Sequence, residues 1–157
     1  MEFRIKRIYI DGYERIAVLD GINQSTEINV HFVRFGEYME SGGNEIVNYT
    51  ETALTGELSI DLVCTHRKVK SAIMHSQPHS GSPYIKAVVD VNSIIDDFSV
   101  KAITSLCDNE LTVHFEEKVS YKKGDLVYIE GSLELDEQIE RYTFPKLGDK
   151  VNVFERC

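Results

Sequence analysis

The chain has 157 residues, of which 42% are hydrophobic and 27% charged, and its net charge is −9 at pH 7. This composition is typical of a soluble globular protein and excludes intrinsic disorder, which requires fewer apolar residues. No apolar run reaches the length of a membrane-spanning helix, and so much negative charge disfavours binding to phosphate backbones.

The N-terminal segment, residues 1–14, alternates like a strand and lacks the continuous apolar region of a secretory signal. The three cysteines are widely spaced and form no CxxC pair, so neither a disulfide framework nor a metal site is indicated. We therefore expect a cytoplasmic protein that forms a single β-rich domain over residues 1–157 and needs no cofactor.

Period-two alternation of apolar and polar residues runs through the first half of the chain. It predicts strands at 3–10 and 13–19, joined by a turn at Asp11-Gly12, a dipeptide that favours hairpins. Further strands are predicted at 26–35 and 54–64.

The second half of the chain continues the same pattern. Strands are predicted at 83–91, 98–106, 110–115, 126–135 and 150–155. Apolar residues between 93 and 106 also recur at helical spacing, which leaves a helix as the alternative there, but their alternation favours a strand. The prediction is an all-β, mostly antiparallel fold of about nine strands with little helix, either one small barrel or a β-sandwich.

Residues 84–135 resemble the strand order of an OB-fold barrel. The stretch KKGDLVYIEG (122–131) is similar to the entry of the fourth strand in such small barrels. By this resemblance Gly124 makes the turn, Val127 and Ile129 face the interior, and Gly131 lets the strand bend. The helix usual in that family has no counterpart here, because EEKVSYKK (116–123) is short.

The loop HSQPHSGSPY (75–84) holds two of the five histidines. Their four-residue spacing would suit a metal site on a helix, but Pro78 lies between them and excludes a helix. The loop also contains no carboxylate. We expect an exposed connection between strands and no metal site.

Charge is distributed unevenly along the chain. Residues 62–89 contain no acid and carry a net +4, whereas residues 108–140 contain ten carboxylates and three lysines, a net −7. The basic window could bind an anion or serve a phosphodiesterase-type hydrolase, because imidazoles and cations suit phosphodiester chemistry. The residues for that alternative are His66, Arg67, Lys68, Lys70, His75, His79 and Lys86.

The acidic stretch favours recognition of a basic protein. The residues predicted to bind this partner are Asp108, Glu110, Glu116, Glu117, Glu130, Glu134, Asp136 and Glu137. In size, acidity and lack of catalytic motifs the chain resembles the immunity proteins of bacterial toxin systems, which implies a cationic partner such as a nuclease toxin. The leading hypothesis is thus a non-enzymatic inhibitor. An OB-type single-strand nucleic-acid binder and a small histidine-dependent hydrolase are the second and third alternatives.

Overall fold

A computed structural model describes residues 1–20, 27–38 and 53–137. The described residues form nine strands and no helix, so none that could span a membrane is present among them. The strands are β1 (Glu2–Asp11), β2 (Glu14–Leu19), β3 (Ile28–Val33), β4 (Ala53–Lys68), β5 (Met74–Ser76), β6 (Tyr84–Asp96), β7 (Ser99–Ile103), β8 (Leu111–Phe115) and β9 (Leu126–Glu137). Within this part of the chain only β3–β9 and β4–β8 pair in parallel, which confirms the all-β, mostly antiparallel prediction.

Several predicted elements differ in detail from the observed ones. Residues 93–106, for which the sequence left a helix as the alternative, contain a β-hairpin and no helix. In this hairpin β6 continues to Asp96 and β7 begins at Ser99. The first turn is Gly12-Tyr13 and not Asp11-Gly12: Asp11 pairs with Glu14, and Gly12 alone takes a positive φ of 64°. That pattern belongs to a type II′ hairpin. The short strand β5 was not predicted, and the predicted strand at 150–155 lies outside the described residues.

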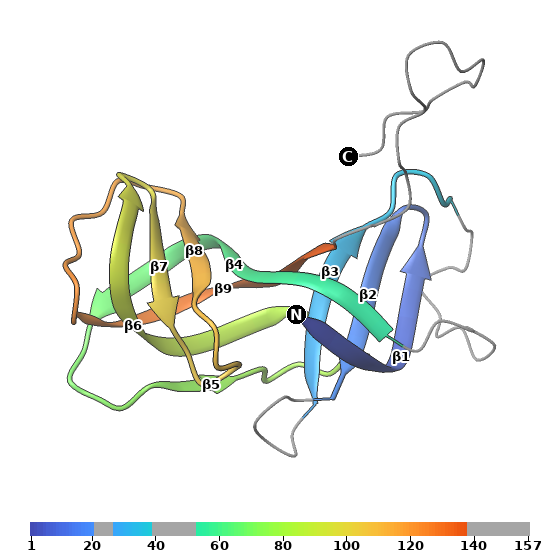
Figure 1. Cartoon of the computed structure of the whole chain (residues 1–157), viewed down its shortest axis with the longest axis horizontal. Coiled ribbons are helices and arrows are strands. Elements are labelled where there is room, and N and C mark those ends of the chain that lie inside the picture. The colour runs from blue at the N-terminus through green and yellow to red at the C-terminus, as the bar shows by residue number, and fades with distance from the viewer. Residues whose placement is uncertain (21–26, 39–52, 138–157) are drawn as a thin grey trace, which may run out of the picture.

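Eight of the nine strands close into two rings that share β4 and β9, and β5 pairs with β6 at the side of the second ring (Figure 1). In the first ring β1, β2 and β3 form a meander, β3 meets β9, and β4 returns to β1. In the second ring β6, β7 and β8 form a meander, β8 meets β4, and β9 returns to β6. Each ring therefore contains five strands, one pair of which is parallel.

Both rings can share β4 and β9 because these strands are long, 16 and 12 residues. Their pairing is irregular between Asp61 and Thr65, where Leu62 has a φ of 58°. Such a bulge bends a strand and changes the direction of its faces. Opposite the bulge lies Gly131, which has no side chain to obstruct the crossing. The bend lets one pair of strands serve two curved sheets.

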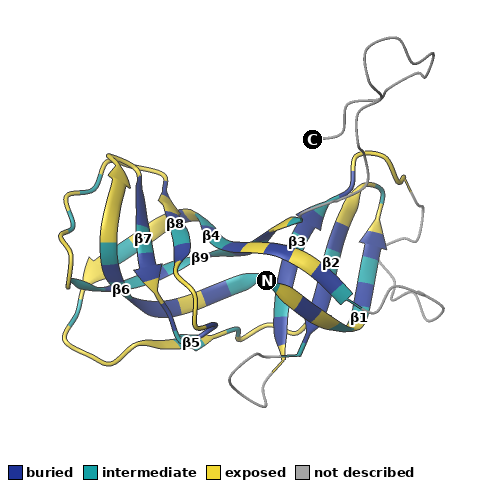
Figure 2. Cartoon of the chain, viewed as in Figure 1, coloured by how far each residue is buried: buried dark blue, intermediate teal, exposed yellow. Residues whose placement is uncertain are grey.

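The inward-facing side chains form one hydrophobic cluster that includes residues of both rings. Burial alternates along the strands, as Figure 2 shows for β4 and β9. On β9, for example, Ile129, Leu133 and Leu135 are buried, while the residues that flank each of them are partly or fully exposed. The alternation read from the sequence thus corresponds to an inner and an outer face.

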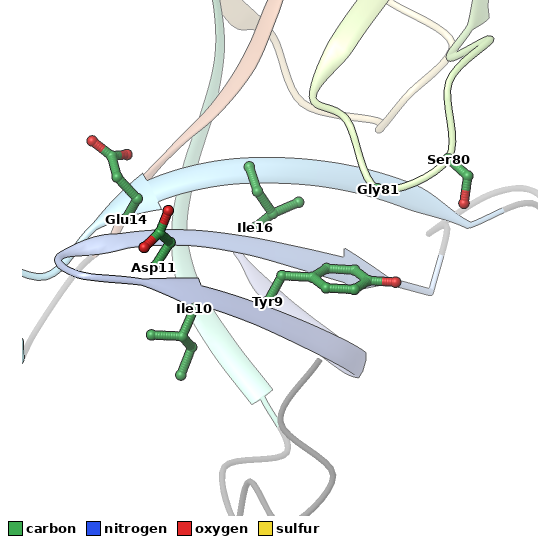
Figure 3. Close-up of a pocket in the computed structure, with 7 residues that line it drawn as sticks. All are labelled: Tyr9, Ile10, Asp11, Glu14, Ile16, Ser80 and Gly81. Atoms are coloured by element: carbon green, nitrogen blue, oxygen red, sulfur yellow. The ribbon is translucent and has the colours of Figure 1, made fainter. Parts of the chain in front are cut away.

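The histidine-containing loop links the two rings. After β5 the chain crosses to β3, where the Gln77 side chain accepts a hydrogen bond from the backbone N–H of Asn29 (2.7 Å) and donates one to its carbonyl (2.8 Å). One amide side chain thereby satisfies both backbone groups of this residue, as a neighbouring strand would. The loop is held in place by this contact, and its Ser80-Gly81 tip lies beside β1 (Figure 3).

Candidate functional site

The eight carboxylates predicted to bind a partner do not form one surface. Asp108 and Glu110 precede β8, Glu116 and Glu117 follow it, and the other four lie on β9. On β9 the alternation separates Glu130, Glu134 and Asp136, which face outward, from Glu137. Several also have intramolecular contacts: Glu110 with Asn92, Glu117 with His66 (2.6 Å) and Glu130 with the hydroxyl of Tyr84.

Glu137 is enclosed in an ion pair with Arg34. The two side chains are only 8% and 5% exposed, and the guanidinium donates two hydrogen bonds to the carboxylate, at 2.6 and 3.1 Å. This pair fixes the segment after β3 against the end of β9. Its role is structural, because a partner cannot reach a carboxylate that is so enclosed.

Carboxylates from four strands gather on the outer face of the first ring. Glu57 on β4 lies directly opposite Asp136 on β9, and Asp11 on β1 lies directly opposite Glu14 on β2. Glu134 on β9 lies between these pairs. We refer to Asp11, Glu14, Glu57, Glu134 and Asp136 as the acidic face; they lie on the outer side of the first ring, on four of its five strands.

A single imidazole lies within the acidic face. His31 on β3 donates from Nδ1 to Glu134 (2.5 Å) and from Nε2 to Glu14. These hydrogen bonds, first that to Glu134, raise the pKa of His31 to about 9. The imidazole is therefore protonated at neutral pH. Five carboxylates and one imidazolium leave the face with a charge of −4.

The opposed carboxylates on this face destabilise the fold. Like charges directly opposite one another on paired strands repel and cost roughly 0.2–1 kcal/mol per pair. Both Asp11–Glu14 and Glu57–Asp136 are such pairs, and all four residues are exposed. A positively charged ligand would relieve this repulsion.

Protonation of His31 should make stability depend on pH. Because the folded pKa of about 9 exceeds the ordinary value of 6.5, its contribution is complete below pH 6.5 and is lost as the pH rises through 9. We expect the free energy of unfolding to fall by about 2 kcal/mol over this window, which allows for screening of the exposed Glu14. Urea denaturation at a series of pH values measures this fall.

The matched variants for this prediction are His31→Gln and His75→Gln. The first should abolish the fall between pH 6.5 and 9. The second should retain it, because burial lowers the pKa of His75 and that residue titrates below the window. An unchanged slope in His31→Gln would contradict the assignment.

A cavity of about 320 Å³ adjoins the acidic face (Figure 3). It is lined by Tyr9, Ile10, Asp11, Glu14, Ile16, Ser80 and Gly81. Tyr9 and Ile16 are paired across β1 and β2 and form an apolar wall, while the two carboxylates lie together at the turn end. The tip of the histidine-containing loop closes the other side.

The residues of the basic window do not converge on one site. His66 hydrogen-bonds with Tyr121 (2.6 Å) and Glu117, and Lys68 pairs with Asp125 at 3.4 Å. Lys68 and Lys70 line another cavity, of about 800 Å³, at the end of β4. The remaining residues are elsewhere: Arg67 lies 4.3 Å from the ring of Tyr128, His75 hydrogen-bonds with Ser105 (2.6 Å), the rings of His79 and Tyr84 lie 5.7 Å apart, and Lys86 is opposite Glu130.

One row of side chains has the residue types of a nucleophilic triad. Ser99 Oγ is 3.1 Å from His114 Nδ1, and His114 Nε2 is 3.8 Å from Asp61 Oδ1. The Ser99 residue is only 6% exposed, however, and a nucleophile must be reached by its substrate. Only the Ser99–His114 contact is a hydrogen bond, since Asp61 Oδ1 has no hydrogen-bond partner among residues 1–20, 27–38 and 53–137, and the row does not have the exposure required of an active site.

The carboxylates of the acidic face can accept hydrogen bonds from a ligand. In the part of the chain that the structure describes, no group of three histidine, cysteine or carboxylate side chains could hold a metal. Both nitrogens of His31 are bonded to carboxylates, so its imidazole has no lone pair to offer. The face is suited to bind a cationic group.

Of the residues on the acidic face, the sequence-based prediction of partner-binding residues had named Glu134 and Asp136, but not Asp11, Glu14, Glu57 or His31. These four lie outside the acid-rich stretch, and the density of acids along the chain gave no signal for them. The predicted hairpin of residues 3–19 could have indicated Asp11 and Glu14 as neighbours, because it places them on adjacent strands. No protein-family model, curated protein or solved structure matches this chain.

Proposed function

We propose that the chain is a non-enzymatic protein that binds a basic protein through its acidic face. The observation that carries this proposal is the pair of directly opposed carboxylate couples, Asp11–Glu14 and Glu57–Asp136. They cost stability in the isolated chain, and they lie on a face with a charge of −4. A positively charged partner offsets that cost, accelerates encounter and is selected over neutral or acidic proteins.

The partner of this proposal is a cationic protein of the kind that an immunity protein neutralises, such as a nuclease toxin. The resemblance in size and acidity supports this class. Of the eight carboxylates predicted from the sequence, the proposed surface keeps Glu134 and Asp136 and adds Asp11, Glu14 and Glu57. Glu137 is omitted because its carboxylate holds Arg34 in a buried pair.

We also propose that the second ring is an OB-type barrel. The meander of β6, β7 and β8 and the return of β9 to β6 support this comparison for residues 84–135, while the fifth strand of the ring and its parallel pairing come from β4, which precedes them in the chain. The comparison does not favour nucleic-acid binding, because Lys68 is paired with Asp125 and Lys86 lies opposite Glu130. A protein ligand is the better fit to the charge of the surface.

Charge reversal tests the proposed function. The chain is expressed together with the products of the genes adjacent to its own, and any complex is reconstituted for titration calorimetry. Replacing both Glu57 and Asp136 with lysine should weaken binding about 100-fold at physiological ionic strength, because it reverses two charges in the interface. The two lysines again place like charges directly opposite one another, as Glu57 and Asp136 do. The double variant therefore introduces no new kind of repulsion into the fold.

The matched control reverses Asp108 and Glu110, which changes the net charge by the same amount before β8. We expect this control to alter affinity less than about fivefold, as a remote change screened by salt should. Equal losses in both variants would mean that only net charge matters. An affinity that survives the reversal at Glu57 and Asp136 would refute the acidic face as the interface.

A further inference from the structure

We propose that the cavity beside the acidic face receives one arginine side chain of the basic partner. This inference rests on the proposed function, since it specifies how the partner is recognised. The cavity combines an apolar wall, formed by Tyr9 and Ile16, with two carboxylates at one end (Figure 3). That combination matches a side chain with an apolar stem and a cationic head.

The size of the cavity suits a side chain better than a whole small molecule. Its volume of about 320 Å³ is at the lower end of the range for ligand pockets. Gly81 contributes to this space: a Cβ placed there would meet the Tyr9 ring at 3.8 Å, and the φ of +68° disfavours any other residue. The loop tip thus lies close to the Tyr9 ring, and the backbone conformation of Gly81 is what favours a glycine there.

The walls of the cavity are formed before any ligand binds. Two backbone–backbone pairs of the hairpin fix Tyr9 against Ile16 and Asp11 against Glu14. On the loop side, Gln77 binds both backbone groups of Asn29. A preformed cavity avoids the entropic cost of ordering loops on binding.

The charges that line the cavity favour an arginine head group over a lysine head group. Glu14 already accepts a hydrogen bond from His31, so Asp11 is the main acceptor for a ligand. A guanidinium donates two parallel hydrogen bonds to a carboxylate and stacks on an aromatic ring, which an ammonium does less well. The chain's own Arg7 lies at the hydroxyl of Tyr9 and pairs with Glu27 at 3.0 Å, outside the lining of the cavity.

The test uses N-acetyl-arginine amide as the probe and follows the backbone amide signals of the full chain by NMR. Its neutral isostere, N-acetyl-citrulline amide, is the control ligand. We expect saturable shifts at Tyr9, Ile16 and Gly81 with arginine and at least about tenfold weaker binding of citrulline, because hydrogen bonds to charged groups are worth a factor of this size. Equal binding of the two probes would overturn the inference.

Two variants distinguish binding of the probe in the cavity from a general attraction of a cation to an acidic surface. Asp11→Asn should weaken arginine binding about tenfold, whereas Asp136→Asn removes the same charge outside the cavity and should change binding less than about twofold. Equal losses in both variants, or no saturable shifts in the unmodified chain, would overturn the inference.

The outcomes also distinguish this inference from the proposed function. If the arginine probe does not bind but reversal of Glu57 and Asp136 disrupts the partner complex, the cavity assignment is wrong and the acidic interface stands. If the probe binds as expected but the complex tolerates that reversal, the proposed function is wrong and the cavity stands as an arginine site.

Discussion

Replacing Glu137 with alanine should lower the free energy of unfolding by about 3–5 kcal/mol, because it leaves the Arg34 guanidinium buried without its carboxylate. Arg34 is 5% exposed and donates two hydrogen bonds to Glu137, at 2.6 and 3.1 Å. Within the described residues Arg34 also pairs with Glu37 at 3.3 Å, but that carboxylate is half-exposed and accepts a weaker interaction than Glu137 does. Urea denaturation monitored by circular dichroism measures the change.

Asp136→Ala is the matched control for this substitution. It removes a neighbouring carboxylate from the exposed side of the same strand, and we expect a change within about 0.5 kcal/mol. The double substitution of Arg34→Met with Glu137→Leu should restore most of the lost stability, since no charge is then buried. If Glu137→Ala unfolds no more easily than Asp136→Ala, the pair does not hold β9 to the segment after β3.

Replacing Gly131 with alanine should cost about 2–3 kcal/mol through overpacking at the crossing of β4 and β9. The new Cβ would lie 2.6 Å from the backbone oxygen of Asp61 and 2.9 Å from methyl groups of Ile60 and Val63. A backbone atom in the bulge cannot move aside without disturbing both rings. Thermal and urea unfolding of the variant measure the cost.

Gly124→Ala controls for the loss of a glycine without crowding. No atom lies within 4 Å of a Cβ at that position, so only its φ of +90° opposes the substitution. We expect a cost of roughly 1–2 kcal/mol from that backbone conformation. A Gly131 variant that is as stable as the Gly124 variant would show that the crossing tolerates a side chain and that the bend has another cause.

The site was less predictable than the strands, for a reason that particular residues illustrate. Asp136 and Glu137 are adjacent in the acid-rich stretch, and both were predicted to bind the partner. In the structure one lies on the outer face and the other is enclosed against Arg34. Conversely, Glu57 and Asp136 are far apart in sequence but lie directly opposite one another. The density of charge along a chain does not determine which charges share a surface.

The loop 75–84 shows the same limit. Its prolines correctly excluded a helix, since this effect acts within a few residues. That Gln77 would bind Asn29 could not be read from the loop, because the two residues meet only after β3 and β5 are placed. The histidines drew attention to this loop, but a glutamine and a glycine carry its contacts with the first ring.

Strand formation here depends on alternation between neighbouring residues, and this local pattern is present in the sequence before any pairing occurs. It was enough to indicate an all-β chain and its hairpins, while the inward orientation of Val127 and Ile129 was implied by the resemblance to small barrels. The closure of two rings depends on which strands pair, and β4 and β9 are each long enough to pair in both. A bulge at Leu62 and the bare backbone of Gly131 decide that arrangement. The acidic face follows from it, because register between distant strands brings its carboxylates together.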